Sequence, residues 1–137
     1  MLVEHFSDED FDVKRDMDLV REILIAVEKS TEPTSSVAII KDHQDRSEEI
    51  LYLIKKMTDA GLITSEGYIC GHIEYGFIEL TWCGHEFLDE VRDNEIWRKT
   101  KDGAQSAGSF SFDLLKSLAR GFAKKQIEDY TGIKLDI

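Results

Sequence analysis

The sequence predicts an α+β fold: a winged helix-turn-helix-like domain with a small antiparallel β-hairpin wing, followed by a C-terminal amphipathic helix. In residues 47–63, apolar side chains recur with the i, i+3, i+4, i+7 spacing of one buried helix face, at Ile50, Leu53, Ile54 and Met57. Gly61 suits the left-handed position just past a helix end. Leu62 and Ile63 then begin a β-prone segment. A helix that ends in this way and runs into a hairpin is typical of the last helix and wing of such a domain.

The elements before this stretch are expected to be one long helix and a short strand. Residues 14–30 have a helical apolar face, and Asp16 or Asp18 favours its N-terminus. Residues 37–40 are a short β-prone run that predicts the first strand of a small sheet. Residues 41–46 are a polar connector, where an ordinary helix-turn-helix would place its first helix, so we expect that element to be reduced to a turn or absent.

The segment after Gly61 predicts the wing and then two helical stretches. Glycines alternate with aromatic and β-branched residues, which indicates strands near 68–73 and 77–80 with a turn at 74–76. Thr81 is expected to cap a helix over residues 82–92. The last helix is expected over residues 112–129, with an apolar face of Leu115, Leu118, Ala119 and Phe122.

This pattern divides the chain into four parts. Residues 1–13 form an acidic N-terminal arm with two phenylalanines, and residues 14–97 form the winged-helix-like domain. Residues 98–111 are rich in Gly, Ser and Ala and predict a linker. Residues 112–137 form the basic C-terminal helix and its tail. The arm is interpreted as a solvated terminus or as a segment that docks on a basic surface.

Composition predicts a cytoplasmic protein that is not a general binder of nucleic acid. The net charge is −11, which repels phosphate backbones. Residues 1–97 carry 9 basic and 23 acidic side chains, whereas residues 98–137 carry 8 basic and 5 acidic ones. No apolar run approaches the roughly 18–20 residues that a membrane span needs, and the N-terminus lacks the pattern of a secretory signal.

Two strings in the sequence are similar to the signatures of an uncharacterised family of phage and prophage proteins. They are KRDMDL at residues 14–19 and LTWCGHEFLD at residues 80–89, within a resemblance that covers roughly residues 14–125. The resemblance implies a bacterial or bacteriophage origin and a winged-helix-like fold. It implies no activity and no catalytic residue, because none is assigned to the family.

The residues that could carry chemistry do not complete a recognised site. His85 and Asp89 lie one helical turn apart and half-resemble a two-histidine zinc helix, but a zinc site needs three or four ligands. His72 or Cys83 could add a ligand only in a favourable fold, so we expect His85 to pack under the wing. Cys70 and Cys83 are expected to be buried free thiols. We therefore predict no metal, no cofactor and no enzymatic activity.

The outward face of the 47–60 helix is the first candidate contact surface. Tyr52, Lys55 and Lys56 could contact nucleic acid or a protein partner. The same face carries the acids Glu48, Glu49 and Asp59. It has no Arg, Asn or Gln to read base edges, and the neighbouring wing is acidic, so it is a poor DNA reader.

The second candidate surface is a basic stripe on the last helix, formed by Lys116, Arg120, Lys124 and Lys125. It is interpreted as a solvated helix face, as a phosphate contact, or as a surface that pairs with the acidic arm. This helix is also the expected seam of a homodimer.

Two functional hypotheses remain. In the first, the chain is a non-enzymatic winged-helix-like module of a mobile element that regulates transcription or replication. In the second, it is a phage-encoded acidic protein that binds and inhibits a host defence or nucleic-acid-processing protein. The partner is protein, DNA or both, and the charge distribution favours protein.

Overall fold

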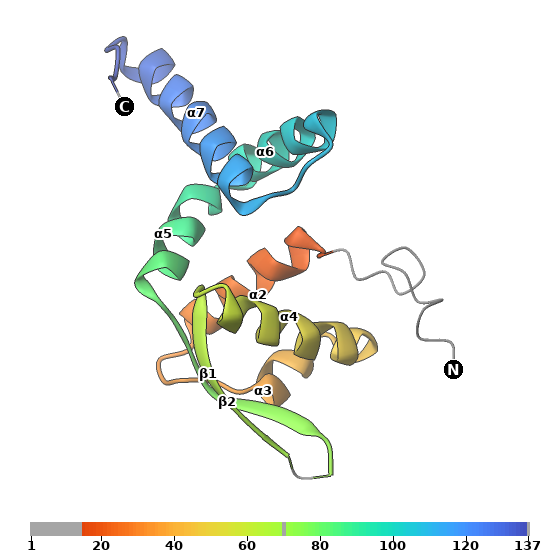
Figure 1. The fold of residues 1–137 in the computed structure, drawn as a ribbon. Coiled ribbons are helices and arrows are strands. Elements are labelled where there is room, and N and C mark those ends of the chain that lie inside the picture. Colours follow the sequence, from red (N-terminus) through yellow and green to blue (C-terminus); the bar gives the residue numbers. More distant parts are fainter. Residues whose placement is uncertain (1–14, 70, 137) are drawn as a thin grey trace. The chain divides into compact units, whose positions relative to one another are not determined.

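The computed structural model of the protein describes residues 15–69 and 71–136. These residues form an α+β structure with six α-helices, one short 3₁₀ helix and one two-stranded antiparallel hairpin (Figure 1). The chain divides into two compact units, residues 1–79 and 80–137. The first contains α2 (Met17–Lys29), α3 (Ser36–Ile40), η2 (Gln44–Arg46), α4 (Ser47–Asp59), β1 (Ile63–Ile69) and β2 (Ile73–Leu80). The second contains α5 (Trp82–Val91), α6 (Asn94–Ala107) and α7 (Phe112–Thr131).

Helix α2 confirms the first predicted helix. The carboxylate of Asp16 accepts a hydrogen bond from the Leu19 amide at 3.2 Å, so Asp16 is the N-cap. The predicted apolar face is buried, namely Met17, Val20, Ile23, Leu24 and Val27. This face packs against α3 and α4 and forms part of the core of the first unit.

The predicted strand at 37–40 is wrong, because these residues belong to helix α3. The Ser35 hydroxyl accepts a hydrogen bond from the Ala38 amide and starts the helix one residue earlier. Ile39 is buried while Val37 is exposed, so packing of a single residue overrides the β propensity of the run. The connector at 41–46 contains only the short η2, since α3 already supplies the short helix of this region.

Extended pairing does occur here, but earlier in the chain than expected. Thr34 forms an antiparallel bridge with Ile78 of β2. Each residue donates its amide to the other's carbonyl, at 3.1 Å and 2.9 Å. The Ser36 hydroxyl also accepts a hydrogen bond from the Tyr75 amide at 3.0 Å. The segment 34–36 therefore ties β2 to the helical part of the unit.

Gly61 ends α4 as predicted. Its φ is +82°, and the Leu62 amide donates to the Met57 carbonyl while the Gly61 amide donates to that of Thr58. These two bonds define a Schellman motif. The accompanying apolar pair, Met57 and Leu62, is buried, as is the α4 face formed by Ile50, Leu53 and Ile54. The chain thus leaves α4 in a fixed direction and enters β1 after one buried residue.

The hairpin is longer than predicted, because β1 ends at Ile69 and β2 begins at Ile73, so the chain turns between these two residues and not at 74–76. Gly71 has a φ of +85° and takes the left-handed position of the turn. Gly76 instead lies within β2, where a Cβ would come within 3.2 Å of the Tyr68 hydroxyl oxygen. A side chain at position 76 would therefore crowd the Tyr68 ring of the opposite strand. A sequence pattern that suggests a turn does not reveal this cross-strand contact.

The second unit is a three-helix arrangement, and it corrects the linker predicted at 98–111. Thr81 caps α5 as expected, by accepting a hydrogen bond from the Gly84 amide. Asp93 caps α6 in the same way through the Ile96 amide. Helix α6 then continues to Ala107, because its buried side chains recur with helical spacing: Trp97, Thr100 and Ala104.

Helix α7 packs along α6 and confirms most of the predicted apolar face. Leu115 and Ala119 are buried, and Leu118 and Phe122 are half-buried. Leu118 lies against Gly103 of α6, where an added Cβ would come within 3.3 Å of the leucine side chain. The ring of Phe112 packs on that of Phe87, with 4.5 Å between the centroids.

The acidic arm predicted at 1–13 lies outside the described residues. Among residues 15–69 and 71–136, no helix combines the length and apolar character that crossing a bilayer requires.

Two glycine substitutions should have opposite effects. Gly61→Ala forces a left-handed residue to carry a Cβ and should lower the free energy of unfolding by about 1 kcal/mol. Gly121→Ala in α7 places a Cβ in open space within a helix and should raise it by about 0.5–1 kcal/mol. Urea titrations followed by circular dichroism measure both; a stable Gly61→Ala protein would contradict the Schellman assignment.

A second prediction concerns Thr100, whose side chain is fully buried in α6. Within the described part of the chain, its hydroxyl oxygen has no hydrogen-bond partner. Thr100→Val keeps the shape and removes the unpaired polar group, so it should raise the free energy of unfolding by about 1 kcal/mol. The same urea titration measures it. Thr100→Ser, which keeps the hydroxyl and loses a methyl group, is the control and should destabilise the protein.

Candidate functional site

The predicted contact residues of α4 are engaged with neighbours on their own helix. Lys55 forms an i, i+4 ion pair with Asp59 at 3.3 Å. The Lys56 ammonium lies 5.5 Å from the centre of the exposed Tyr52 ring, a cation–π distance. The face therefore offers an aromatic ring and two cations, one of which is partly neutralised. It has no fork of donors for base edges.

Beside this face, Arg46 joins the starts of two helices. Its guanidinium contacts Asp16 at 2.6 Å and Glu49 at 2.9 Å. Hydrogen bonds from these carboxylates, that of Asp16 first, raise the pKa of Arg46 above its ordinary value. Because all three side chains are about one-third exposed, the cluster is worth little stability. Its arginine is committed to the protein and does not contribute to an anion site.

The basic stripe on α7 is also partly occupied. Arg120 is paired with Glu90 of α5, and Lys125 lies 3.8 Å from Asp129. The Lys116 ammonium lies 5.3 Å from the centre of the Phe112 ring. Lys124 is half-buried. The two predicted sets of contact residues thus belong to different compact units, and the stripe is broken by acidic partners.

The residues weighed for metal binding are not gathered into a site. Cys83 and His85 are exposed, so the expected burial of the Cys83 thiol and packing of His85 are wrong. The His72 imidazole contacts the Glu74 carboxylate at 2.6 Å at the base of the wing turn. Cys70 lies outside the described residues. Among those described, no three His, Cys, Asp or Glu side chains are grouped closely enough to hold a metal ion.

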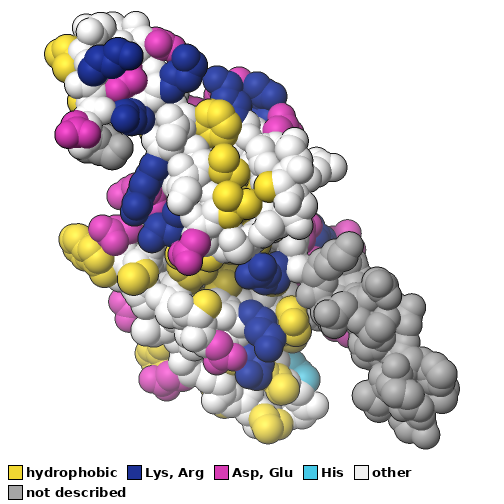
Figure 2. All heavy atoms as spheres, turned by 45° about the horizontal axis from the view of Figure 1, so that its top comes forward, with side chains coloured by type: hydrophobic (Ala, Val, Ile, Leu, Met, Phe, Trp, Pro, Cys, Tyr) yellow, Lys and Arg dark blue, Asp and Glu magenta, His cyan; other side chains and the backbone are white. Residues whose placement is uncertain are grey.

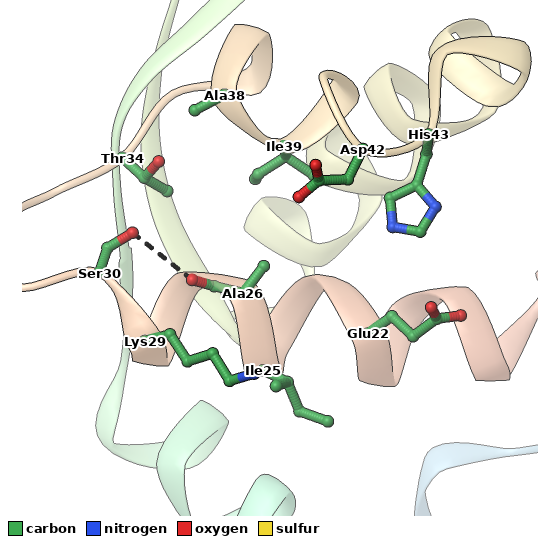
Figure 3. Close-up of a pocket in the computed structure, with 10 residues that line it drawn as sticks. All are labelled: Glu22, Ile25, Ala26, Lys29, Ser30, Thr34, Ala38, Ile39, Asp42 and His43. Atoms are coloured by element: carbon green, nitrogen blue, oxygen red, sulfur yellow. Dashed lines mark hydrogen bonds between the residues drawn. The ribbon is translucent and has the colours of Figure 1, made fainter.

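A groove of about 380 Å³ lies between α2 and α3 (Figure 3). Glu22 and Lys29 come from α2, and Asp42 and His43 from the turn after α3. The Ser30 hydroxyl donates to the Ala26 carbonyl at 3.5 Å and is not paired with His43. The groove therefore brings acidic and basic side chains to one place without the nucleophile–base contact that acyl transfer requires.

The hairpin lies in a stretch of the chain that has no basic side chain. Residues 57–91 contain seven Asp and Glu and no Lys or Arg, and three of these acids, Glu66, Glu74 and Glu79, belong to the hairpin. The hairpin also exposes several large apolar side chains, namely Tyr68, Ile69, Ile73 and Phe77. Ile69, at the end of β1, is 81% exposed. A pair of strands that exposes acidic and apolar side chains can bind the surface of another protein, whereas its negative charge is repelled by a phosphate backbone.

Phe77 is the most unusual residue of the wing. It has a φ of +51°, and among the described residues it is the single non-glycine with a positive φ. Its side chain is nevertheless 64% exposed. A bulky residue in this region is strained by about 1–3 kcal/mol, and such strain persists only where neighbouring contacts fix the backbone. Here the Ile78–Thr34 bridge and the Tyr75–Ser36 hydrogen bond fix it from both sides.

On the face drawn in Figure 2, Lys and Arg side chains occur together with Asp, Glu and apolar side chains. The acidity of the hairpin was predicted from its amino-acid composition. The exposed aromatic residues and the strained Phe77 were missed, because exposure and φ depend on the register of the hairpin.

A family model described as "Hypothetical protein (DUF2513)" matches residues 14–110 of the chain. The chain belongs to the DUF2513 family. A relative from Haemophilus influenzae, described as an uncharacterized protein, is 33% identical over 111 residues, which are 79% of this chain and 93% of the relative. No solved structure matches the chain. The DUF2513 match includes both strings on which the family resemblance was based and ends before α7.

For this DUF2513 protein, Phe77→Asn should separate stability from surface chemistry. Asparagine tolerates the left-handed region, so the substitution should leave the free energy of unfolding unchanged or raise it by up to about 1 kcal/mol. Ile78→Ala, at the neighbouring buried position, is the matched control and should cost about 2–4 kcal/mol. If Phe77→Asn costs as much as Ile78→Ala, the phenylalanine supports the fold and is not a surface residue.

Proposed function

We propose that this protein is a non-enzymatic interaction module whose first unit is a winged helix with a protein-binding wing. Three helices followed by a hairpin, with Thr34 as a one-residue first strand on Ile78, support the winged-helix assignment. In that arrangement α4 corresponds to the recognition helix and β1–β2 to the wing. Gly61 sets the passage from one to the other.

The strained, exposed Phe77 on a wing without any Lys or Arg carries the proposal. A wing that contacts DNA needs cations near the phosphates, whereas residues 57–91 supply only acids. An exposed aromatic ring held by a fixed backbone is, in contrast, the usual form of an anchor at a protein interface. The strain is tolerated because an interaction outside the fold uses the ring.

The chemistry of the wing defines the class of partner. Glu66, Glu74 and Glu79 would face Lys and Arg side chains, and the exposed ring and Ile69 would fill apolar contacts between them. The partner surface is therefore basic with an apolar centre. Nucleic-acid-processing proteins present basic surfaces to their substrate, so an acidic wing competes naturally for such a site.

Within this proposal the family resemblance supplies the context. The module serves a phage or another mobile element, either as a regulator of transcription or replication or as an inhibitor of a host protein. Both roles require the same property, which is tight contact with a basic protein surface. The inhibitor role explains the net charge of −11 directly, since the molecule then mimics the charge of a nucleic acid.

Affinity capture from a bacterial lysate with immobilised protein tests the proposal. The wild-type chain should retain a basic protein in a salt-sensitive manner, and Phe77→Asn should lose it while remaining folded. Tyr52→Ser, which removes an exposed aromatic side chain of α4, is the matched control and should retain the partner. Equal capture by the wild type and Phe77→Asn would overturn the assignment of the wing.

Fluorescence anisotropy with duplex DNA at low salt tests the competing hypothesis. We expect no binding, because the basic side chains of α4 and α7 are interspersed with acids. Binding that weakens steeply as salt is added, and that is lost in Lys116→Glu/Lys124→Glu, would contradict the proposal and identify α7 as a phosphate-contacting helix.

A further inference from the structure

The groove between α2 and α3 carries opposite charges at its two ends. Its α2 wall is a single stripe of the helix with i, i+3, i+4, i+7 spacing, made of Glu22, Ile25, Ala26 and Lys29. Seven residues of α-helix rise by about 10.5 Å, which separates the backbone positions of Glu22 and Lys29. This spacing exceeds the i, i+3 and i, i+4 separations at which side chains of one helix pair. An acid and a lysine are therefore held apart at the two ends of the stripe.

The opposite wall adds polar groups to each end of the groove. Asp42 and His43 lie on the side of Glu22, whereas Thr34 lies toward the end of α2, where Lys29 is (Figure 3). One end thus presents two carboxylates and an imidazole, and the other presents an ammonium and a hydroxyl group. Such an arrangement attracts a cation to the first end and an anion to the second.

The polar side chains at the two ends are not paired with one another. Within residues 15–69 and 71–136, no hydrogen bond or ion pair is formed by the side chains of Glu22, Lys29, Asp42, His43 and Thr34. Arg46 of the same unit, in contrast, is held by two carboxylates. A ligand can therefore contact the polar groups of the groove without first breaking an ion pair among the described residues.

The middle of the groove is aliphatic. Ile25 and Ala26 of α2 lie on one side of it, and Ala38 and Ile39 of α3 lie on the other. A methylene chain covers such a surface without losing a hydrogen bond, whereas a peptide amide placed there would lose water and find few partners in exchange. The volume of about 380 Å³ is at the lower end of the range of sites for small molecules.

We propose that this groove binds a linear ω-amino acid, which is a methylene chain with an ammonium group at one end and a carboxylate at the other. The ammonium group donates to the carboxylates of Glu22 and Asp42. The carboxylate accepts from the ammonium group of Lys29 and the hydroxyl group of Thr34, and the chain lies over the aliphatic middle. The lining includes no residue of β1 or β2, so this site is independent of the proposed binding by the hairpin.

Amide NMR titration of the isotope-labelled full chain tests the proposal with ε-aminocaproate as the probe. It should bind in the millimolar range, because the charges of the groove are open to solvent and salt, and it should shift amide signals of α2 and α3. Hexylamine and caproate, which each keep one charge, should bind about two- to fivefold more weakly. Glycine carries both charges but is too short to reach both ends, so it should not bind measurably.

Three results of these titrations would overturn the proposal. The first is a one-charge analogue that binds as tightly as ε-aminocaproate, since the groove would then not recognise both charges. The second is a set of shifted signals that lies outside α2, α3 and the turn after α3. The third is tighter binding of trialanine, which has the same terminal charges but amides in its middle, because the aliphatic middle would then not select the ligand.

Side-chain variants test the role of each end. Lys29→Met should lower the affinity for ε-aminocaproate to that for hexylamine and leave hexylamine binding unchanged, whereas Glu22→Gln with Asp42→Asn should weaken the binding of both ligands. Lys41→Met removes an exposed lysine that does not line the groove and is the matched control. Equal weakening by Lys29→Met and Lys41→Met would show a general charge effect and refute the site. The NMR spectrum of each variant reports whether the chain is still folded.

Discussion

The left-handed turn at Gly61 is the constraint on which the first unit depends. Two hydrogen bonds close the end of α4, and one residue later the chain is already committed to β1. The apolar face of α4 is buried on one side of this turn, and the hairpin begins on the other. A different backbone conformation at this point would turn the hairpin away from the 34–36 segment, and the bridge between Thr34 and Ile78 could not form.

That bridge in turn explains how an unfavourable residue is kept in the wing. Phe77 lies between two residues of β2 that are hydrogen-bonded to the 34–36 segment. The backbone of the strand is therefore held two residues before Phe77 and one residue after it, and Phe77 adopts a positive φ between these points. Stability of the helical part of the unit is used to fix the direction of an exposed ring. This coupling links the core of the first unit to the surface that we propose as its binding site.

The sequence predicted those features that depend on local periodicity and on caps. Helix α2, the end of α4 at Gly61 and the Thr81 cap of α5 were all predicted correctly from the chain itself. The prediction failed where a tertiary contact determines the secondary structure or the exposure of a residue. Val37 and its neighbours have β propensity but become helical. Helix α6 was missed at 98–107 because its Gly, Ser and Ala residues resemble a linker, whereas Gly103 is small at the point where Leu118 of α7 packs closely. The exposure of Phe77 likewise required the register of the hairpin.

The absence of Lys and Arg from residues 57–91 has a practical consequence. Trypsin cleaves after these two residue types, so the wing and most of α5 would leave a digest as one long fragment between Lys56 and Arg92. Amine-reactive reagents, which modify lysine, would record nothing along this surface however firmly it is bound. Reagents that couple carboxylates to the amines of a partner would report on it directly, through Glu66, Glu74 and Glu79.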